Sequence, residues 1–109
     1  MKAILIFLAM CGAALAHGDA QWISDGGYVG IDSDGHEVKC CGISDCRKLA
    51  DSDVLQIDDD DWRIVATGQV FVHEQKGLHD SEDGWFWGCM RYKNGVPIYH
   101  CLFVTRTKA

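Results

Sequence analysis

Residues 85–104 read WFWGCMRYKNGVPIYHCLFV, two runs rich in aromatic and β-branched side chains on either side of an Asn-Gly pair. Asn94-Gly95 is typical of two-residue hairpin turns, because both positions of such turns need positive φ angles that Asn and Gly tolerate. Pro97 lacks a backbone donor, which suits a place beside the turn or on a sheet edge. The sequence therefore predicts a central hairpin of strands 85–92 and 96–104.

A two-residue turn also fixes which residues of the two strands lie opposite each other. The predicted pairs are Arg91 with Ile98, Trp87 with Leu102, Cys89 with His100, and Gly88 with Cys101. Successive side chains alternate between faces, so Cys89 and Cys101 cannot bridge each other without a bulge. We expect both faces to be covered, since each is bulky and apolar: Trp85, Trp87 and Leu102 on one, and Phe86, Tyr99 and Phe103 on the other.

The rest of the chain reads mostly as short strands. Residues 28–31 and 37–38 flank Asp-Ser-Asp-Gly and predict a second hairpin. Further strands are expected at 54–57, 62–65 and 69–73. Ser44 is a candidate cap for one short helix over 45–50. We therefore expect a mainly β fold, with a small α+β arrangement as the alternative: a single antiparallel-sheet domain with one short helix, held by disulfides.

Charge and length narrow the class of protein. Sixteen acidic against ten basic residues give a formal net charge of −6, which argues against nucleic-acid binding through phosphate neutralisation. With 109 residues and no repeat or linker, residues 17–109 are expected to form one domain. The four consecutive residues Asp58 to Asp61 repel one another and predict an exposed turn.

Residues 1–16 have the organisation of a signal peptide. Lys2 precedes an apolar run over 4–10, and Ala14-Leu15-Ala16 matches the small-residue cleavage pattern. Cleavage there would make His17 the first residue of a secreted or periplasmic protein. The apolar run is shorter than the roughly 18 to 20 residues that span a bilayer, so we expect no stable membrane insertion.

After that cleavage an odd number of cysteines remains: Cys40, Cys41, Cys46, Cys89 and Cys101. In an exported chain they predict structural disulfides, with Cys89 and Cys101 each reaching the Cys40–Cys46 segment and the connectivity left open. One thiol is left over, to be buried, reactive, metal-bound, or paired with a second copy in a homodimer. A thiol redox protein is the weaker interpretation, because the C-x-x-C spacing is absent.

His17 raises the alternative of a copper site. An N-terminal histidine offers copper an α-amine and an imidazole nitrogen, but a second histidine is needed. The candidates are His36, His73, His79 and His100. His36 with Cys40, and His100 with Cys101, are the nearest approximations to zinc ligand pairs. A solvated terminal histidine is the plainer interpretation.

Two other motifs each have an ordinary structural role as the alternative to a binding role. Trp85 and Trp87 would form a binding face for sugars or peptides if one side of the hairpin were open, with core packing as the alternative. Asp32-Ser33-Asp34-Gly35 is similar to part of a calcium loop, but Gly30 and Cys41 then occupy ligand positions, so no calcium site is predicted.

A combination of motifs runs along the chain. The parts are Trp22-Ile23 with Gly26-Gly27-Tyr28, then Cys40-Cys41-Gly42 with Asp45-Cys46, then Asp83-Gly84 with Phe86-Trp87 and Cys89, and finally Cys101 with Phe103. This C-C-G-x-x-D-C, D-G-x-F-W-x-C, C-x-F pattern resembles small exported cysteine-rich bacterial proteins of unknown function. The resemblance implies export, disulfides and a single domain, and it brings no catalytic or binding residues.

The sequence thus favours an exported binding or structural module over an enzyme. We expect it to meet a protein or envelope component through its acidic surface and the Trp85–Trp87 face. The alternatives are a periplasmic copper-binding protein that uses His17 and a thiol redox protein.

Overall fold

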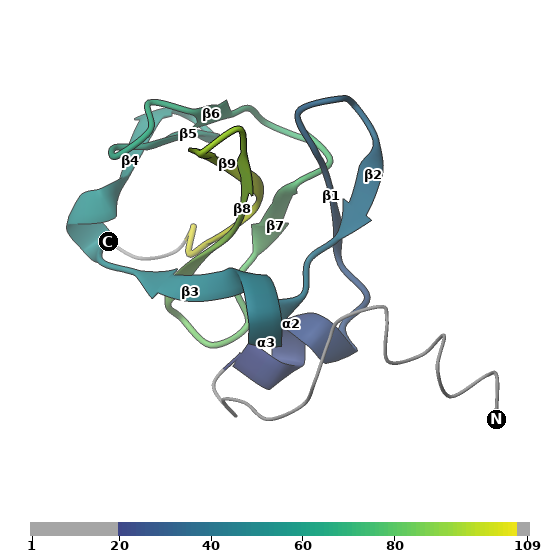
Figure 1. Ribbon diagram of the computed structural model, residues 1–109. Coiled ribbons are helices and arrows are strands. Elements are labelled where there is room, and N and C mark those ends of the chain that lie inside the picture. Colours follow the sequence, from purple (N-terminus) through teal and green to yellow (C-terminus); the bar gives the residue numbers. More distant parts are fainter. Residues whose placement is uncertain (1–19, 107–109) are drawn as a thin grey trace, which may run out of the picture.

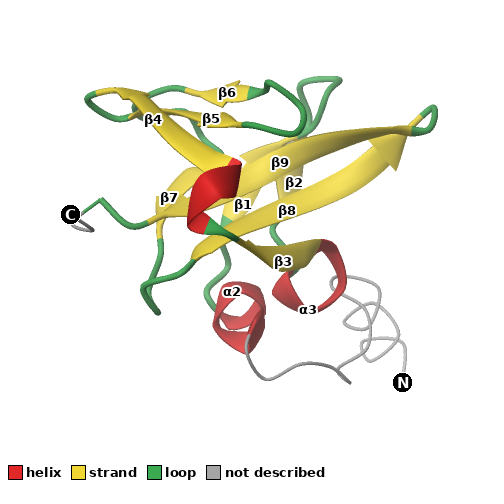
Figure 2. Ribbon diagram, turned by 90° about the vertical axis from the view of Figure 1, so that its left-hand side faces the viewer, coloured by secondary structure: helices red, strands yellow, loops and turns green. Residues whose placement is uncertain are grey.

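A computed structural model of the chain describes residues 20–106 as a layered β structure (Figure 1). The predicted signal peptide and His17 lie outside the described residues. Figure 2 shows a three-stranded sheet on one side of the long β8–β9 hairpin and two short helices on the other. A two-stranded hairpin of β1 (Val29–Ile31) and β2 (Glu37–Lys39) completes the fold, as predicted.

The central sheet has the strand order β3-β8-β9-β7. Its strands are β3 (Cys46–Leu49), β8 (Phe86–Lys93), β9 (Val96–Val104) and β7 (Leu78–Asp80). The hairpin prediction is confirmed, since β8 and β9 are antiparallel and Asn94 and Gly95 have φ angles of 54° and 80°. β7 runs parallel to β9, so the sheet is not purely antiparallel.

A bulge at His100 corrects the predicted register. Near the turn the pairing is as expected, with Arg91 opposite Ile98. Between Met90 and Cys89 the register shifts by one residue, because β9 contributes His100 as an extra residue. Beyond the bulge the pairs are Trp87 with Phe103, Gly88 with Leu102, and Cys89 with Cys101. Leu102 and Phe103 therefore lie on the faces opposite to those predicted.

The bulge is enclosed by two glycines. A Cβ atom on Gly30 of β1 would lie 1.8 Å from the His100 carbonyl oxygen, and one on Gly77 would lie 2.4 Å from the same atom. Neither position has room for a side chain, so both segments approach the bulge by their bare backbones.

One face of the hairpin packs against the three-stranded sheet β4-β5-β6. The strands are β4 (Val54–Asp58), β5 (Asp61–Ile64) and β6 (Val70–Phe71), close to the predicted ranges. The core between the two sheets includes Trp62, Ile64, Phe71, Phe86, Leu102 and Val104. Gln69 links the layers further, as its side chain hydrogen-bonds both the N–H and the carbonyl of Tyr99.

The other face packs against α2 (Gln21–Asp25). Ile23 of α2 is fully buried in a cluster with Trp87, Phe103 and the disulfide cysteines. Asp83 fixes this arrangement, because its carboxylate accepts hydrogen bonds from the indole N–H groups of both Trp22 and Trp87. Both faces of the hairpin are thus covered, as the sequence predicted.

The predicted helix over 45–50 is wrong. The structure has a short helix α3 (Gly42–Asp45) just before it, and residues 46–49 form β3. β3 pairs with β8, with Cys46 directly opposite Cys89, and this tertiary pairing overrides the local preference for a helix. α2 and the 3-10 helix η2 (Asp51–Asp53) were not predicted. Within residues 20–106 no helix is long and apolar enough to cross a membrane.

The four-aspartate turn is only partly a solvated loop. Asp58 and Asp59 are exposed, but the Asp60 side chain is only 14% exposed. Its carboxylate accepts hydrogen bonds from Arg106, Trp62 and His73. Arg106 holds the pKa of Asp60 well below its usual range, with Trp62 and His73 adding to the effect. Asp60 therefore ties the turn to the end of the described chain.

Candidate functional site

The cysteine segment is structural. Cys40 is bonded to Cys101 and Cys46 to Cys89, so both hairpin cysteines reach the Cys40–Cys46 segment as predicted. Cys41 is buried and disulfide-bonded as well, so residues 20–106 hold no free cysteine. The sequence predicted one unpaired thiol after cleavage at residue 16; the described part of the uncleaved chain has none, and a homodimer joined through such a thiol stays a prediction.

The predicted Trp85–Trp87 face is not an open platform. Trp85 is 50% exposed, but Trp87 is 3% exposed and belongs to the core. Lys48 lies over the Trp85 ring at 4.6 Å from its centroid and also reaches the Trp87 ring. A binding face that needs both indoles is therefore wrong, because the side chain of Trp87 is directed into the α2 cluster.

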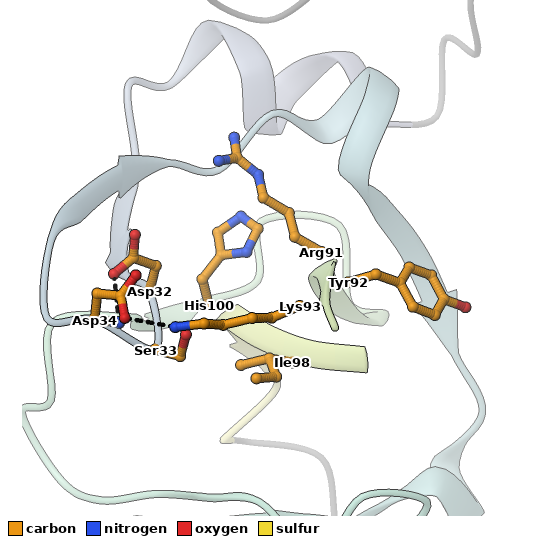
Figure 3. A pocket seen from close by; sticks show the side chains of 8 residues that line it. All are labelled: Asp32, Ser33, Asp34, Arg91, Tyr92, Lys93, Ile98 and His100. Atoms are coloured by element: carbon orange, nitrogen blue, oxygen red, sulfur yellow. Dashed lines mark hydrogen bonds and ion pairs between the residues drawn. The ribbon is translucent and has the colours of Figure 1, made fainter. Parts of the chain in front are cut away.

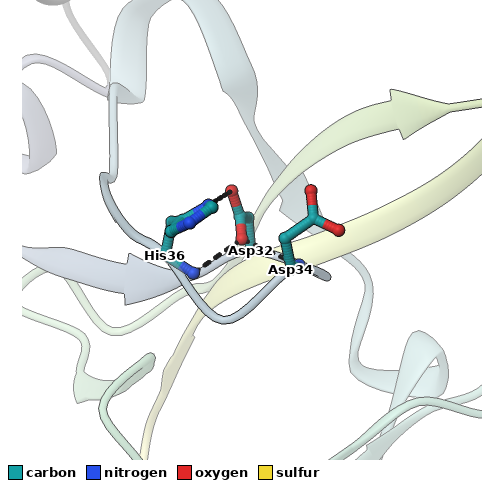
Figure 4. A group of neighbouring side chains, drawn as sticks. All are labelled: Asp32, Asp34 and His36. Atoms are coloured by element: carbon teal, nitrogen blue, oxygen red, sulfur yellow. Dashed lines mark hydrogen bonds and ion pairs between the residues drawn. The ribbon is translucent and has the colours of Figure 1, made fainter.

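The predicted metal ligands do not converge on one site. His17 lies outside the described residues. His36 is exposed and lies beside Asp32 and Asp34, with one possible ligand atom of each within 4.8 Å of the others (Figure 4). One Asp32 oxygen accepts hydrogen bonds from the backbone N–H groups of Asp34 and His36, so it shapes the β1–β2 turn. Neither Cys40 nor Cys101 is available as a thiolate, since both are in a disulfide.

His100 is not part of that group but lies nearby, in the wall of a pocket of about 250 Å³ that Asp32 and Asp34 also line. The pocket is lined by Asp32, Ser33 and Asp34 from the β1–β2 turn, by Arg91, Tyr92 and Lys93 from the end of β8, and by Ile98 and His100 from β9. Figure 3 shows the His100 imidazole between the side chains of Asp32 and Arg91. The bulge places His100 here, because an extra residue in β9 redirects its side chain.

The His100 ring is buried and incompletely hydrogen-bonded. Its side chain is 2% exposed, and its Nε2 atom has no hydrogen-bond partner in the described part of the chain. The nearest carboxylate oxygen, Oδ2 of Asp45, is 3.9 Å away and is already paired with Arg91. Burial lowers the pKa of His100, and the positive charge of Arg91 lowers it further. The ring is therefore neutral near pH 7.

A second exposed feature is the outer side of the β4-β5-β6 sheet. Five aliphatic side chains there are between 37% and 49% exposed, and we call them the aliphatic face: Leu55, Ile57, Val65, Val70 and Val72. Leu55, Val65 and Val70 each stand next to a buried core residue in the chain, namely Val54, Ile64 and Phe71, whereas Ile57 lies at the bulge of β4 between two exposed residues. Arg63 lies opposite both Leu55 and Val70 in the strand register, so it sits within this face.

Comparison with protein families, with curated proteins and with solved structures found no match for this chain.

Sequence reasoning identified neither of these two features as a site. The aliphatic face had a visible signal, since runs such as Val70-Phe71-Val72 are apolar at consecutive positions, which makes both sides of a strand apolar. The pocket had a weaker one, because placing His100 beside Asp32 and Arg91 depends on a bulge and on contacts between distant segments.

Proposed function

We propose that the protein is an exported binding module that docks a partner protein through the aliphatic face. The observation that carries the proposal is a group of five aliphatic side chains in or beside the strands of the small sheet, each between 37% and 49% exposed. Groups of exposed apolar side chains mark interaction sites where they form a patch. The disulfides support export, since they persist in oxidising compartments.

Charge favours a basic partner over a second copy of the chain. Asp58 and Asp59 are exposed at the turn that joins β4 and β5, next to Ile57. A second copy would bring the same turn and the same net charge of −6 to the interface. A partner with an apolar centre and lysine or arginine residues at its rim would complement both features. Arg63 offers the partner one polar contact within the face.

Site-directed photo-cross-linking in the producing cells tests the proposal. A photoreactive amino acid is placed at Val70 on the aliphatic face and, as a matched control, at Val96, which is 55% exposed near the hairpin turn. The adduct is identified by mass spectrometry and the partner is then purified. Capture alone does not count as support, and the deciding measurement is the affinity of the purified complex.

For that complex we expect Val70→Asp to weaken binding at least about tenfold, since it places a charge in a desolvated contact. Val96→Asp should leave the affinity unchanged. The double variant Asp58→Asn with Asp59→Asn should slow association and reduce its dependence on salt. Equal effects of Val70→Asp and Val96→Asp would overturn the assignment. So would a wild-type homodimer in sedimentation that Val70→Asp dissociates.

A further inference from the structure

The pocket beside His100 shares no residue with the aliphatic face and needs a separate explanation. Nε2 of His100 has no partner, while the ring is hydrogen-bonded to the backbone of Lys39 through its other nitrogen. That bond favours the protonated ring, so the Lys39 carbonyl is the acceptor and Nδ1 the donor. In the neutral ring Nε2 is then an unsatisfied acceptor. Buried acceptors without a partner are uncommon and destabilising, which indicates a place for a donor from outside the chain.

The charges that line the pocket are balanced. Asp32 and Asp34 supply two negative charges, and Arg91 and Lys93 supply two positive ones. Lys93 Nζ lies 2.5 Å from Asp34 Oδ1 across the pocket, and Arg91 Nε lies 3.2 Å from Asp45 Oδ2. A purely cationic ligand would compete for these carboxylates and leave Arg91 or Lys93 unpaired. A purely anionic ligand would compete for Arg91 and Lys93 and leave the aspartates unpaired.

We propose that this pocket binds a small zwitterion with a primary ammonium and a carboxylate group, the chemistry shared by free amino acids and short peptides. The ammonium group donates to Nε2 of His100 and lies near the carboxylates of Asp32 and Asp45. The ligand carboxylate pairs with Arg91 and Lys93. In this arrangement the two charges of the ligand replace the ion pairs that Arg91 makes with Asp45 and Lys93 makes with Asp34. A pocket of about 250 Å³ is of the size expected for an amino acid rather than for a larger ligand.

A ligand reaches Nε2 only if a neighbouring side chain moves, and Arg91, which is paired with the Asp45 carboxylate 3.9 Å from Nε2, is the one we assign. Nε2 itself is covered, and the Arg91 side chain that holds Asp45 is 51% exposed. Exposed arginine side chains change rotamer on the nanosecond scale or faster, so Arg91 can swing out and then close on the ligand carboxylate. Lys93, with a side chain 45% exposed, can exchange Asp34 for the ligand in the same way.

Three small probes related to alanine separate the contributions of the two charged groups of the ligand. L-Alanine carries both groups, ethylamine carries only the ammonium, and propionate carries only the carboxylate. Each is titrated into the full chain labelled with ¹⁵N, and the Nε2 resonance of His100 is followed together with the heat of binding. We expect saturable binding of L-alanine in the millimolar range or tighter, a change in the Nε2 shift, and weaker binding of both single-charge probes. L-Alanyl-L-alanine then distinguishes peptides from free amino acids as the preferred source.

Variants at exposed positions keep the test independent of folding. Arg91→Gln should weaken L-alanine binding about tenfold, as expected for a lost charge-assisted contact. His36→Gln is the control, because His36 neighbours Asp32 but does not line the pocket. No binding of L-alanine, or binding of ethylamine with equal strength, would overturn the proposal. So would a Zn²⁺ ion that binds with the same Nε2 shift while L-alanine does not. Loss of this site leaves docking through the aliphatic face untouched, so the two proposals fail separately.

Discussion

The two faces of the β8–β9 hairpin are both buried, but they are held by different means. On the α2 side, Cys89 and Cys101 form disulfides, and Trp87 is hydrogen-bonded to Asp83. On the side of the small sheet, the contact is apolar packing with a few hydrogen bonds. A five-residue helix such as α2 is too short to be stable alone, whereas a three-stranded sheet covers the hairpin with its own apolar side. Cross-links thus lie where the covering element is smallest.

The largest effect should come from breaking a cross-link on the α2 side. Replacing Cys40 and Cys101 together by alanine opens a loop with a sequence separation of 61 residues. Chain entropy alone predicts a loss of about 4 kcal/mol in the free energy of unfolding. Urea denaturation monitored by tryptophan fluorescence measures it. The matched pair Cys46 and Cys89, separated by 43 residues, should cost slightly less. An unchanged midpoint for both double variants would show that the covering helix needs no cross-link.

A cavity in the core on the side of the small sheet should lower the free energy of unfolding somewhat less than loss of a disulfide does. Ile64 is 1% exposed in the core between the sheets, and Ile64→Ala should lower the free energy of unfolding by about 3 kcal/mol. The neighbouring residue Val65 points outward and is 49% exposed, so Val65→Ala should change it by no more than about 0.5 kcal/mol. Equal losses for the two variants in the same denaturation experiment would contradict the assignment of Ile64 to the buried side and of Val65 to the exposed side.

The hydrogen bonds of Asp83 should contribute less to the free energy of unfolding than the disulfides or the Ile64 side chain. Asp83→Ala leaves the indole N–H of the buried Trp87 without its acceptor, and a loss of about 2 kcal/mol is expected. The fluorescence of Trp22 and Trp87 should change as well. Asp59→Ala, at an exposed aspartate, is the control. If Asp83→Ala has the same free energy of unfolding as that control, the hydrogen bonds from Trp22 and Trp87 to Asp83 do not stabilise the fold.

The smallest effect is a dependence on pH at the far end of the small sheet. The pKa of Asp60 is lowered, chiefly by Arg106, so its contribution is present above the ordinary value of 3.8 and is lost as the pH falls through the folded pKa. The pKa of His73 is raised, chiefly by Asp60, so its contribution is present below 6.5 and is lost as the pH rises through the folded pKa.

Thermal unfolding between pH 2 and pH 9, a range that brackets ordinary carboxyl and imidazole pKa values, tests both directions. In Asp60→Asn the loss of stability at acid pH should be reduced. The small loss above neutrality should shrink, because His73 keeps Glu74 as its only carboxylate neighbour among the described residues. A wild-type curve with the same shape as that of Asp60→Asn would refute the assignment. The result separates this polar link from the cross-links of the α2 side, which do not titrate in this range.

Local sequence predicted the two strands and the turn of the β8–β9 hairpin, but not the bulge that shifts the register between the strands. Asn94-Gly95 determines the turn and the pairs next to it, because that information lies within four residues. The bulge at His100 has no such local mark. It is fitted between Gly30 and Gly77, which are 70 and 23 positions away along the chain, and it decides that Phe103 rather than Leu102 faces α2. For the same reason the strand β3 was read as a helix.

The candidate sites also divide into those that local sequence marks and those that depend on contacts between distant segments. The disulfide segment was predicted because the cysteines follow a stretch with the pattern of a signal peptide, and that pattern favours disulfides over free thiols. The Trp85–Trp87 face was predicted wrongly, since the aromatic pattern alone does not say which indole is covered by α2. The His100 pocket gathers residues from the β1–β2 turn, β8 and β9, and no local pattern brings those three segments together.

The nesting of these two disulfides, Cys46–Cys89 within Cys40–Cys101, has a consequence for resistance to proteolysis. The Cys46–Cys89 bridge lies entirely inside the loop closed by Cys40 and Cys101. A protease that cuts the exposed Asp58-Asp59 turn therefore cuts within both loops, and each fragment stays attached to the other through two sulfur bridges. Under non-reducing conditions the two fragments stay covalently joined, and the mass of the nicked molecule rises only by the water added at the cut bond. Proteolysis, which inactivates many small domains in one step, would here need several cuts or a reductant.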